Sequence, residues 1–132
     1  MKIIQNAVRI LDGGKFVYLR SEHRHHYNTY ELENGESFAV DGGCEYFRRS
    51  FSENAKKYVD DYSLTTESTF GEVCEKLLWG SRGKSGNEPL LVCPFKELTK
   101  EHLIAIRNYD DKLKQRLSLL QLQVINYWIE NQ

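Results

Sequence analysis

The sequence predicts an α+β protein of a single domain, in which residues 1–64 are mainly β-sheet and residues 65–132 are mainly helical. Two observations lead to this prediction. Near the N-terminus, short stretches of alternating apolar and polar residues are separated by glycine turns, a pattern typical of antiparallel strands. Near the C-terminus, apolar residues recur at helical spacing. A chain of 132 residues is long enough to bury a core of its own.

Residues 2–41 are predicted to form an antiparallel β-meander. Its strands are expected at residues 2–11, 15–20, 25–32 and 37–40. The segments Asp12-Gly13-Gly14 and Asn34-Gly35 are hairpin signals. Gly42 and Gly43 end the sheet, and we expect them at positive φ, where glycine is most comfortable.

The next residues are predicted to form short elements. Residues 44–49 are expected to make one helical turn that places Arg48 and Arg49 on the surface. A loop at 50–57 and one more strand at 57–64 complete the mainly β part.

A short helix and a strand then follow. Thr69 and Glu72 fit a capping box, so a helix is expected to begin at Phe70, with Gly80 as its C-terminal cap. Residues 89–95 are predicted to be a short buried strand, in which Pro94 indicates either an edge strand or the end of the strand.

The segment 99–132 is predicted to be a long helix or a helix pair, with Thr99 as its N-cap. One apolar stripe, interrupted by Asp110, comprises Leu103, Ile106, Leu113, Leu117, Leu120, Val124 and Tyr127. A second set on another face comprises Leu119, Leu122, Ile125 and Ile129. Because one sheet covers one stripe of a helix, we expect one face to contact the protein's own sheet and the other a second copy. The alternative is that both faces are covered within the monomer. Residues 108–111 are where a break is expected.

Composition excludes several classes of protein. The net charge is -1 and the pI near 6.4, so no bulk positive field attracts nucleic acid or anionic lipid. Cys44, Cys74 and Cys93 lie far apart and form no CxxC pair, which indicates reduced intracellular thiols. Neither a membrane-spanning run nor a signal peptide is recognisable, so we expect a cytoplasmic protein.

Residues 79–88 are a candidate phosphate-binding loop. Glycines, small polar side chains and the cations Arg82 and Lys84 are the groups that a phosphate needs. Trp79 at the edge of the loop is suited to stack on a base, and Asn87 to bind hydroxyls. The spacing is not that of a P-loop. The alternative is a solvated loop with Trp79 in the core.

Residues 21–26 hold three histidines and Arg24. A metal site is one interpretation, but adjacent strand residues point in opposite directions and no cysteine is near. We favour a polar face that offers Arg24 and His25 to an anion, with plain surface exposure as the alternative. Arg107 adds a cation on the last helix, where a dimer would bring two copies together. No catalytic motif is recognisable, so neither an enzyme nor a cofactor is expected.

Several segments resemble a family of small phage-encoded proteins. They are residues 2–9 (KIIQNAVR), 21–25 (SEHRH) and 39–43 (AVDGG) with Tyr46, Arg48 and Arg49, and later 79–86 (WGSRGKSG), 89–90, 102–103 and 105–106. Members of that family often have cysteine pairs suggestive of a zinc ribbon. At the corresponding positions, around 10–13 and 30–35, this chain has no cysteine, so the resemblance implies no zinc site here.

Within that group, the order of an N-terminal sheet followed by assembling helices looks like the anti-Thoeris sponge proteins. This resemblance implies a phage protein that binds a cyclic ADP-ribose signal in the cytoplasm of the infected host and sequesters it without cleavage. The residues expected to contact the ligand are Arg24, His25, Trp79, Arg82, Lys84, Asn87 and Arg107. The alternative function is binding of nucleic acid or a host protein through basic loops, and a small phosphodiesterase is a third.

Overall fold

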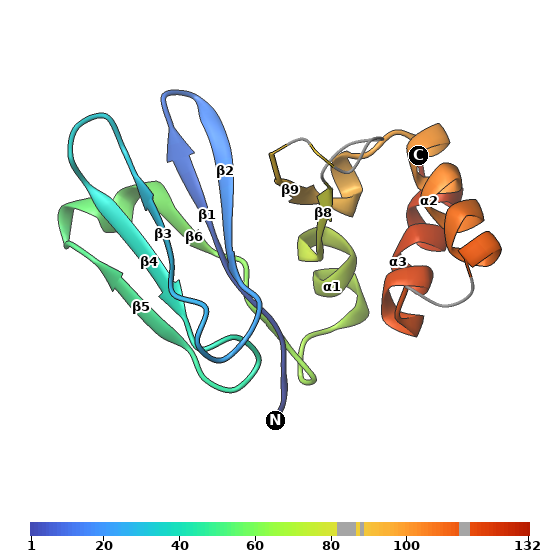
Figure 1. The fold of residues 1–132 in the computed structure, drawn as a ribbon, viewed down its shortest axis with the longest axis horizontal. Coiled ribbons are helices and arrows are strands. Elements are labelled where there is room, and N and C mark those ends of the chain that lie inside the picture. The colour runs from blue at the N-terminus through green and yellow to red at the C-terminus, as the bar shows by residue number, and fades with distance from the viewer. Residues whose placement is uncertain (82–86, 88, 114–116) are drawn as a thin grey trace. The chain divides into compact units, whose positions relative to one another are not determined.

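The computed structural model describes residues 1–81, 87, 89–113 and 117–132, with only the backbone for 110–113. It confirms the predicted α+β class, with antiparallel strands first and helices after them (Figure 1). The chain forms two compact units, Met1–Ser68 and Thr69–Gln132. The predicted change from sheet to helix at residues 64–65 lies close to this boundary. That the chain is a single domain stays a prediction.

The first unit contains two antiparallel sheets. In one, β1 (Ile3–Asp12) lies between β2 (Lys15–Ser21) and β6 (Val59–Asp61), and β7 (Leu64–Thr65) also pairs with β1. In the other, β3 (Asn28–Glu31), β4 (Ser37–Asp41) and β5 (Arg48–Phe51) follow one another. Figure 1 shows the β1–β2 hairpin in blue and the second sheet from cyan to green. The strands predicted at 2–11, 15–20 and 37–40 are present as β1, β2 and β4, and the strand predicted at 25–32 is shorter, as β3. The single meander predicted for 2–41 is wrong, because β1 and β2 belong to one sheet and β3 and β4 to the other. The strand predicted at 57–64 is divided into β6 and β7, and a 3₁₀ helix, η1 (Asn54–Tyr58), takes part of the loop predicted at 50–57.

The core of the first unit follows from strand alternation. Val8 and Ile10 share the inward face of β1, and Phe38 and Val40 lie on β4. One buried cluster holds all four together with Leu19, Leu32 and Ala55. Because both sheets contribute to this cluster, burial of their apolar faces holds them together.

The predicted helical turn at 44–49 is wrong. Gly42 and Gly43 have φ of 104° and 53°, as expected for the turn that ends β4. A tight turn follows, in which Glu45 donates its backbone N–H to the carbonyl of Gly42, and the chain returns as β5 beside β4. Pairing along this edge satisfies the backbone of residues 48–51, so the local helical preference does not decide their structure.

The second unit begins with the helix that the capping signal predicts. The hydroxyl of Thr69 accepts the backbone N–H of Glu72, and α1 covers Phe70–Lys76. The prediction of Gly80 as its cap is wrong, because Gly80 lies within β8 (Leu78–Ser81), which pairs with β9 (Leu91–Pro94). Pro94 ends β9 as predicted, but Leu91 is exposed instead of buried.

The C-terminal segment is a helix pair. After η2 (Phe95–Glu97), α2 covers Lys100–Leu113 and α3 covers Leu119–Glu130. The hydroxyl of Thr99 accepts the N–H of His102, as expected of an N-cap. The predicted break at 108–111 is misplaced, because α2 continues through those residues. A new helix starts where Ser118 and Gln121 form a reciprocal capping box.

The helices cover part of each other's apolar surface. Val124 from the first apolar stripe and Ile125 from the second are both fully buried, and α3 packs against α1, α2 and η2. The indole N–H of Trp128 donates to the carbonyl of Cys74 at 2.8 Å, which fixes α3 against α1. Leu119 remains 73% exposed. Both predicted stripes thus contribute to the interior of this unit, and association with a second copy stays a prediction.

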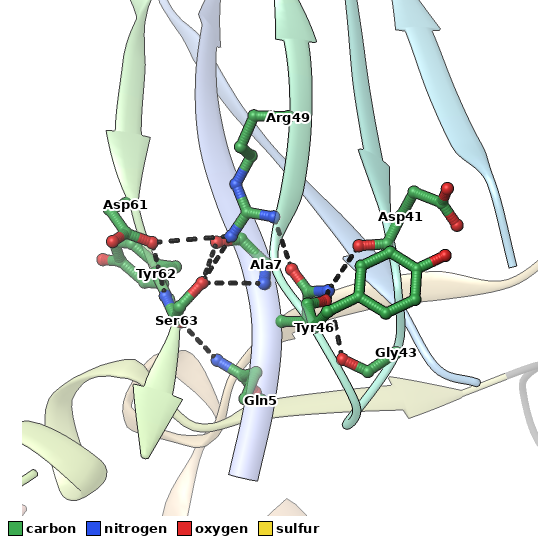
Figure 2. Close-up of polar contacts among 10 residues, drawn as sticks. Gln5, Ala7, Asp41, Gly43, Tyr46, Arg49, Asp61, Tyr62 and Ser63 are labelled. Carbon is green, nitrogen blue, oxygen red and sulfur yellow. Dashed lines mark hydrogen bonds and ion pairs between the residues drawn. The ribbon is translucent and has the colours of Figure 1, made fainter. Parts of the chain in front are cut away.

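A buried asparagine links the two sheets of the first unit, and its partners Asp41, Gly43 and Tyr46 are labelled in Figure 2. Asn6 lies on the inward face of β1 and is 1% exposed. Its amide nitrogen donates to the backbone carbonyls of Asp41, Gly43 and Tyr46 at 2.8, 3.0 and 3.1 Å. These carbonyls lie where the chain leaves β4 and no longer pairs with a neighbouring strand. The side chain of Asn6 therefore supplies the N–H donors that strand pairing would otherwise provide.

Arg49 completes this network from β5. Its guanidinium donates to the side-chain oxygen of Asn6 and to the hydroxyl of Ser63, and lies 3.7 Å from the carboxylate of Asp61. Ser63 in turn donates to the carbonyl of Ala7 on β1. Burial lowers the pKa of the Arg49 guanidinium, and the charge of Asp61 opposes this shift. The prediction that Arg49 lies on the surface is therefore wrong, whereas Arg48 is exposed as expected.

We expect Asn6→Ala to lower the free energy of unfolding of the first unit by about 2–4 kcal/mol, because it leaves buried carbonyls and a guanidinium without partners. Trp79 and Trp128 both lie in the second unit, so the measurement is amide hydrogen exchange of β1 and β4 and not tryptophan fluorescence. Asn34→Ala, which removes an exposed turn contact to Glu36, is the matched control and should cost less than about 1 kcal/mol. Equal losses for the two variants would contradict the linking role of Asn6.

Candidate functional site

Two loops of the first unit lie against each other and form what we call the paired-loop surface, residues 22–27 and 42–47. The backbone N–H of Gly43 donates to the hydroxyl of Ser21, at the end of β2, at 3.0 Å. The hydroxyl of Tyr46 donates to the carbonyl of Arg24, and the Arg24 guanidinium lies 3.6 Å from the carboxylate of Glu45. Each loop therefore supports the other.

The contact between the loops requires glycine at position 43. A Cβ added there would lie 2.3 Å from the backbone carbon of His23, far inside van der Waals contact. The positive φ of Gly43 also disfavours other residues. The backbones of the two loops thus approach more closely than any side chain at this position would permit.

Buried polar side chains hold both loops from beneath. Ser21 is 2% exposed, and its hydroxyl donates to the carbonyl of His26 at 2.6 Å while it accepts from Gly43. The side-chain amide of Asn6 donates to the carbonyls of Gly43 and Tyr46. Both loops are therefore anchored by hydrogen bonds to side chains buried in the first unit.

The outer side of the paired-loop surface combines cationic, imidazole and aromatic groups. The side chain of Arg24 is 62% exposed. The rings of His23 and His26 are stacked with centroids 5.1 Å apart. Further exposed residues are His25, Tyr27, Tyr46 and Phe47. Acidic groups are also present: Glu45 lies near Arg24, and Glu22 accepts a hydrogen bond from Arg20.

The structure distributes the predicted site residues over both units. Arg24 and His25 lie in the first unit, on the paired-loop surface. Trp79, Asn87 and Arg107 belong to the second unit. Arg82 and Lys84 lie outside the described residues, so their predicted role stays a prediction.

Trp79 is packed at the edge of the core of the second unit. Its ring lies 5.5 Å from that of Phe95, which is fully buried. Its indole nitrogen is enclosed and has no hydrogen-bond partner among the described residues. Asn87 is exposed. This packing agrees with the alternative interpretation of residues 79–88, in which Trp79 belongs to the core.

Arg107 lies beside a groove on the second unit. Its guanidinium donates to the side-chain oxygen of Asn126 at 2.8 Å, which joins α2 to α3. An open groove of ≈ 490 Å³ is lined by Phe70, Gln123, Asn126, Tyr127 and Glu130. Phe70 and Tyr127 meet edge to face, with centroids 6.0 Å apart.

Among the residues that the structure describes, no group of three His, Cys, Asp or Glu side chains is placed to bind a metal ion. Residues 10–13 and 30–35, where no cysteine is present, contact each other through other groups. The hydroxyl of Tyr30 donates to the carboxylate of Asp12 at 2.6 Å, and this hydrogen bond raises the pKa of Tyr30. Ile10 and Leu32 belong to the same buried cluster.

The three cysteines are free and differ in exposure. Burial raises the pKa of the thiols of Cys74 and Cys93, which favours their protonated, unreactive form. Cys44 is exposed on the paired-loop surface.

Sequence reasoning missed Asn6 and Ser21, the residues that hold the loops. A signal for Asn6 exists in the sequence: it has the same strand parity as Val8 and Ile10, so an alternating strand places it among core residues. A polar residue at a core position needs internal partners. Its three carbonyl partners are more than thirty residues away, and nothing in the sequence indicates them.

Comparisons with protein-family models, with curated proteins and with solved structures find no significant match to this chain. None of the helices in the described ranges has the length and apolar character that crossing a membrane requires.

We expect Gly43→Ala to destabilise the first unit by about 3 kcal/mol or more, because the added methyl group displaces the backbone of His23. Gly35→Ala is the matched control. Gly35 also has positive φ, at 91°, but an added Cβ there meets no atom within 4 Å, so only backbone strain of about 1 kcal/mol is expected. Chemical denaturation followed by amide exchange of the first unit measures both variants. Equal destabilisation would show that the loops are not in contact.

Proposed function

We propose that this protein binds a cyclic ADP-ribose-type signal and sequesters it without cleavage, as an anti-defence protein of a phage. The resemblance of its segments to phage-encoded proteins supports this proposal. The observation that carries it is the paired-loop surface, where an exposed arginine stands beside stacked imidazoles and exposed aromatic rings on loops with buried anchors. Such a signal has a diphosphate, riboses and an adenine, which need a cation, hydrogen-bonding groups and a stacking surface.

The charge of Arg24 is accessible to such a ligand. The Arg24 guanidinium lies 3.6 Å from the carboxylate of Glu45, and both side chains are exposed. Exposed ion pairs of this kind contribute about 1 kcal/mol or less to stability. A diphosphate offers bidentate, doubly charged acceptors and would displace Glu45. His25 and the exposed rings of Tyr46 and Phe47 are the proposed partners of the ribose and the base.

We further propose that copies of the protein associate through α3. Among its twelve residues, Glu130 is the only charged one, and Leu119 remains exposed. The groove beside Tyr127 would accept apolar side chains of a second copy. Because Arg107 contacts Asn126 in this groove, association would bring two copies of Arg107 near the seam. Trp79, Arg82, Lys84 and Asn87 remain proposed ligand contacts on the basis of the sequence.

Sequestration requires affinity and a slow release, and no bond of the ligand changes. The alternative function is nucleic-acid or host-protein binding through the same basic and aromatic loops. The two functions differ in how binding responds to salt. A protein that neutralises the phosphates of a nucleic acid releases counterions, so its affinity for the nucleic acid falls steeply as the salt concentration rises.

We expect the protein to deplete cyclic ADP-ribose isomers from solution and to return them intact after heating, as measured by mass spectrometry of the supernatant. Degraded ligand would identify an enzyme, and ligand that is never depleted would reject the proposal. Binding of single-stranded oligonucleotides that weakens steeply between 50 mM and 200 mM salt would instead favour the alternative.

Arg24→Ala should lower the affinity for the depleted isomer at least about ten-fold, because it removes a charge-assisted contact to phosphate. Lys56→Ala is the matched control, since Lys56 is also an exposed cation paired with a glutamate, Glu53, but lies outside the paired-loop surface. Calorimetric titration measures both variants. An equal loss for both would indicate a non-specific charge effect.

We expect native mass measurement to give a dimer or a multiple of dimers, and Leu119→Glu to give a monomer, because a charge would be buried at the seam. Leu91→Glu is the matched control: Leu91 is 74% exposed on β9, so the two positions start from the same exposure. A monomeric wild-type protein would contradict the proposed association.

A further inference from the structure

The loop 22–27 is closed by a hydrogen bond in which an imidazole is the acceptor. The backbone N–H of Glu22 donates to Nδ1 of His26 at 3.0 Å. The backbone N–H of His26 donates to the carbonyl of His23 at 2.9 Å, and the hydroxyl of Ser21 donates to the carbonyl of His26. Both ends of the loop thus converge on one half-buried histidine.

This geometry assigns the protonation state of His26. A ring nitrogen that accepts an N–H carries no proton, so the neutral ring has its hydrogen on Nε2. An imidazolium has a proton on both nitrogens and accepts no hydrogen bond, so rotating the ring cannot restore the contact. Protonation of His26 is therefore incompatible with this loop closure.

The groups around His26 make the closed state sensitive to charge. The ring of His23 is stacked on it, with centroids 5.1 Å apart. The carboxylate of Glu22 is held by Arg20, and that of Glu45 lies near Arg24. His25 adjoins the ring in the chain. Histidine is the side chain whose ordinary titration falls between about pH 5 and 8.

We propose that His26 is a pH-sensitive latch of the paired-loop surface. When the ring is neutral, the bond from Glu22 closes the loop and keeps Arg24 in contact with Glu45 and Tyr46. When the ring is protonated, the bond is lost and the loop opens at Glu22. The control of ligand binding by this latch rests on the proposed function, whereas the opening of the loop does not.

The test is an NMR titration of the full chain without ligand between pH 8 and pH 5. The amide resonance of Glu22 should shift with the same midpoint as the imidazole of His26, and its hydrogen exchange, corrected for intrinsic rate, should become at least ten-fold faster at the acidic end. A Glu22 amide that is insensitive to pH would overturn the proposal.

His26→Asn separates the latch from other titrations. The side-chain oxygen of asparagine takes the place of Nδ1 as an acceptor but does not titrate, so the Glu22 amide should stay protected and constant across the range. The His23→Asn variant keeps the acceptor, Nδ1 of His26, so the pH-dependent shift of the Glu22 amide should persist. A Glu22 shift that persists in His26→Asn would show that another group is responsible. Because no ligand is present, a failure to bind cyclic ADP-ribose would reject the proposed function and leave this result unaffected.

Discussion

The first unit depends on one buried amide. β1 is the centre of its sheet, and the side chain of Asn6 on β1 reaches the point where β4 turns away towards β5. Apolar burial alone draws the two sheets together but is non-directional, whereas an amide with three carbonyl partners fixes their register. The charge of Arg49 on the other side of the amide is tolerated because Asn6, Ser63 and Asp61 surround it. The network thus links β1 to the turn that follows β4.

This arrangement separates stability from recognition. The residues that hold the paired loops, Asn6 and Ser21, are almost fully buried, and the residues that the loops present are exposed. Loops on a rigid support are the usual location of binding groups, because their side chains are free of packing constraints while their backbone is fixed. Exposed side chains that make no contact between the loops can therefore change with little effect on the fold, provided that Gly42 and Gly43 are kept.

The sequence predicted what is local and missed what is distant. Strand alternation, glycine turns and the caps at Thr69 and Thr99 are set by neighbouring residues, and the structure confirms them. The helix break was expected at Asn108 and its neighbours, whereas the second helix begins after the reciprocal cap of Ser118 and Gln121. The division into two sheets, the end of α1 and the burial of Arg49 depend on pairing between segments far apart in the chain, which no local pattern indicates. Of the predicted site, Arg24 and His25 share one loop, while Trp79, Asn87 and Arg107 belong to the other unit.

The position of Cys44 has a practical consequence. Two of the three thiols are shielded and kept protonated by their surroundings, while the third stands in solvent among residues 42–47. A maleimide dye would therefore attach at one place on the wild-type chain, beside Arg24 and its neighbours, without any engineered handle. Emission from such a label would report occupancy or rearrangement of these loops directly, and quenching by soluble iodide would tell an open surface from a covered one.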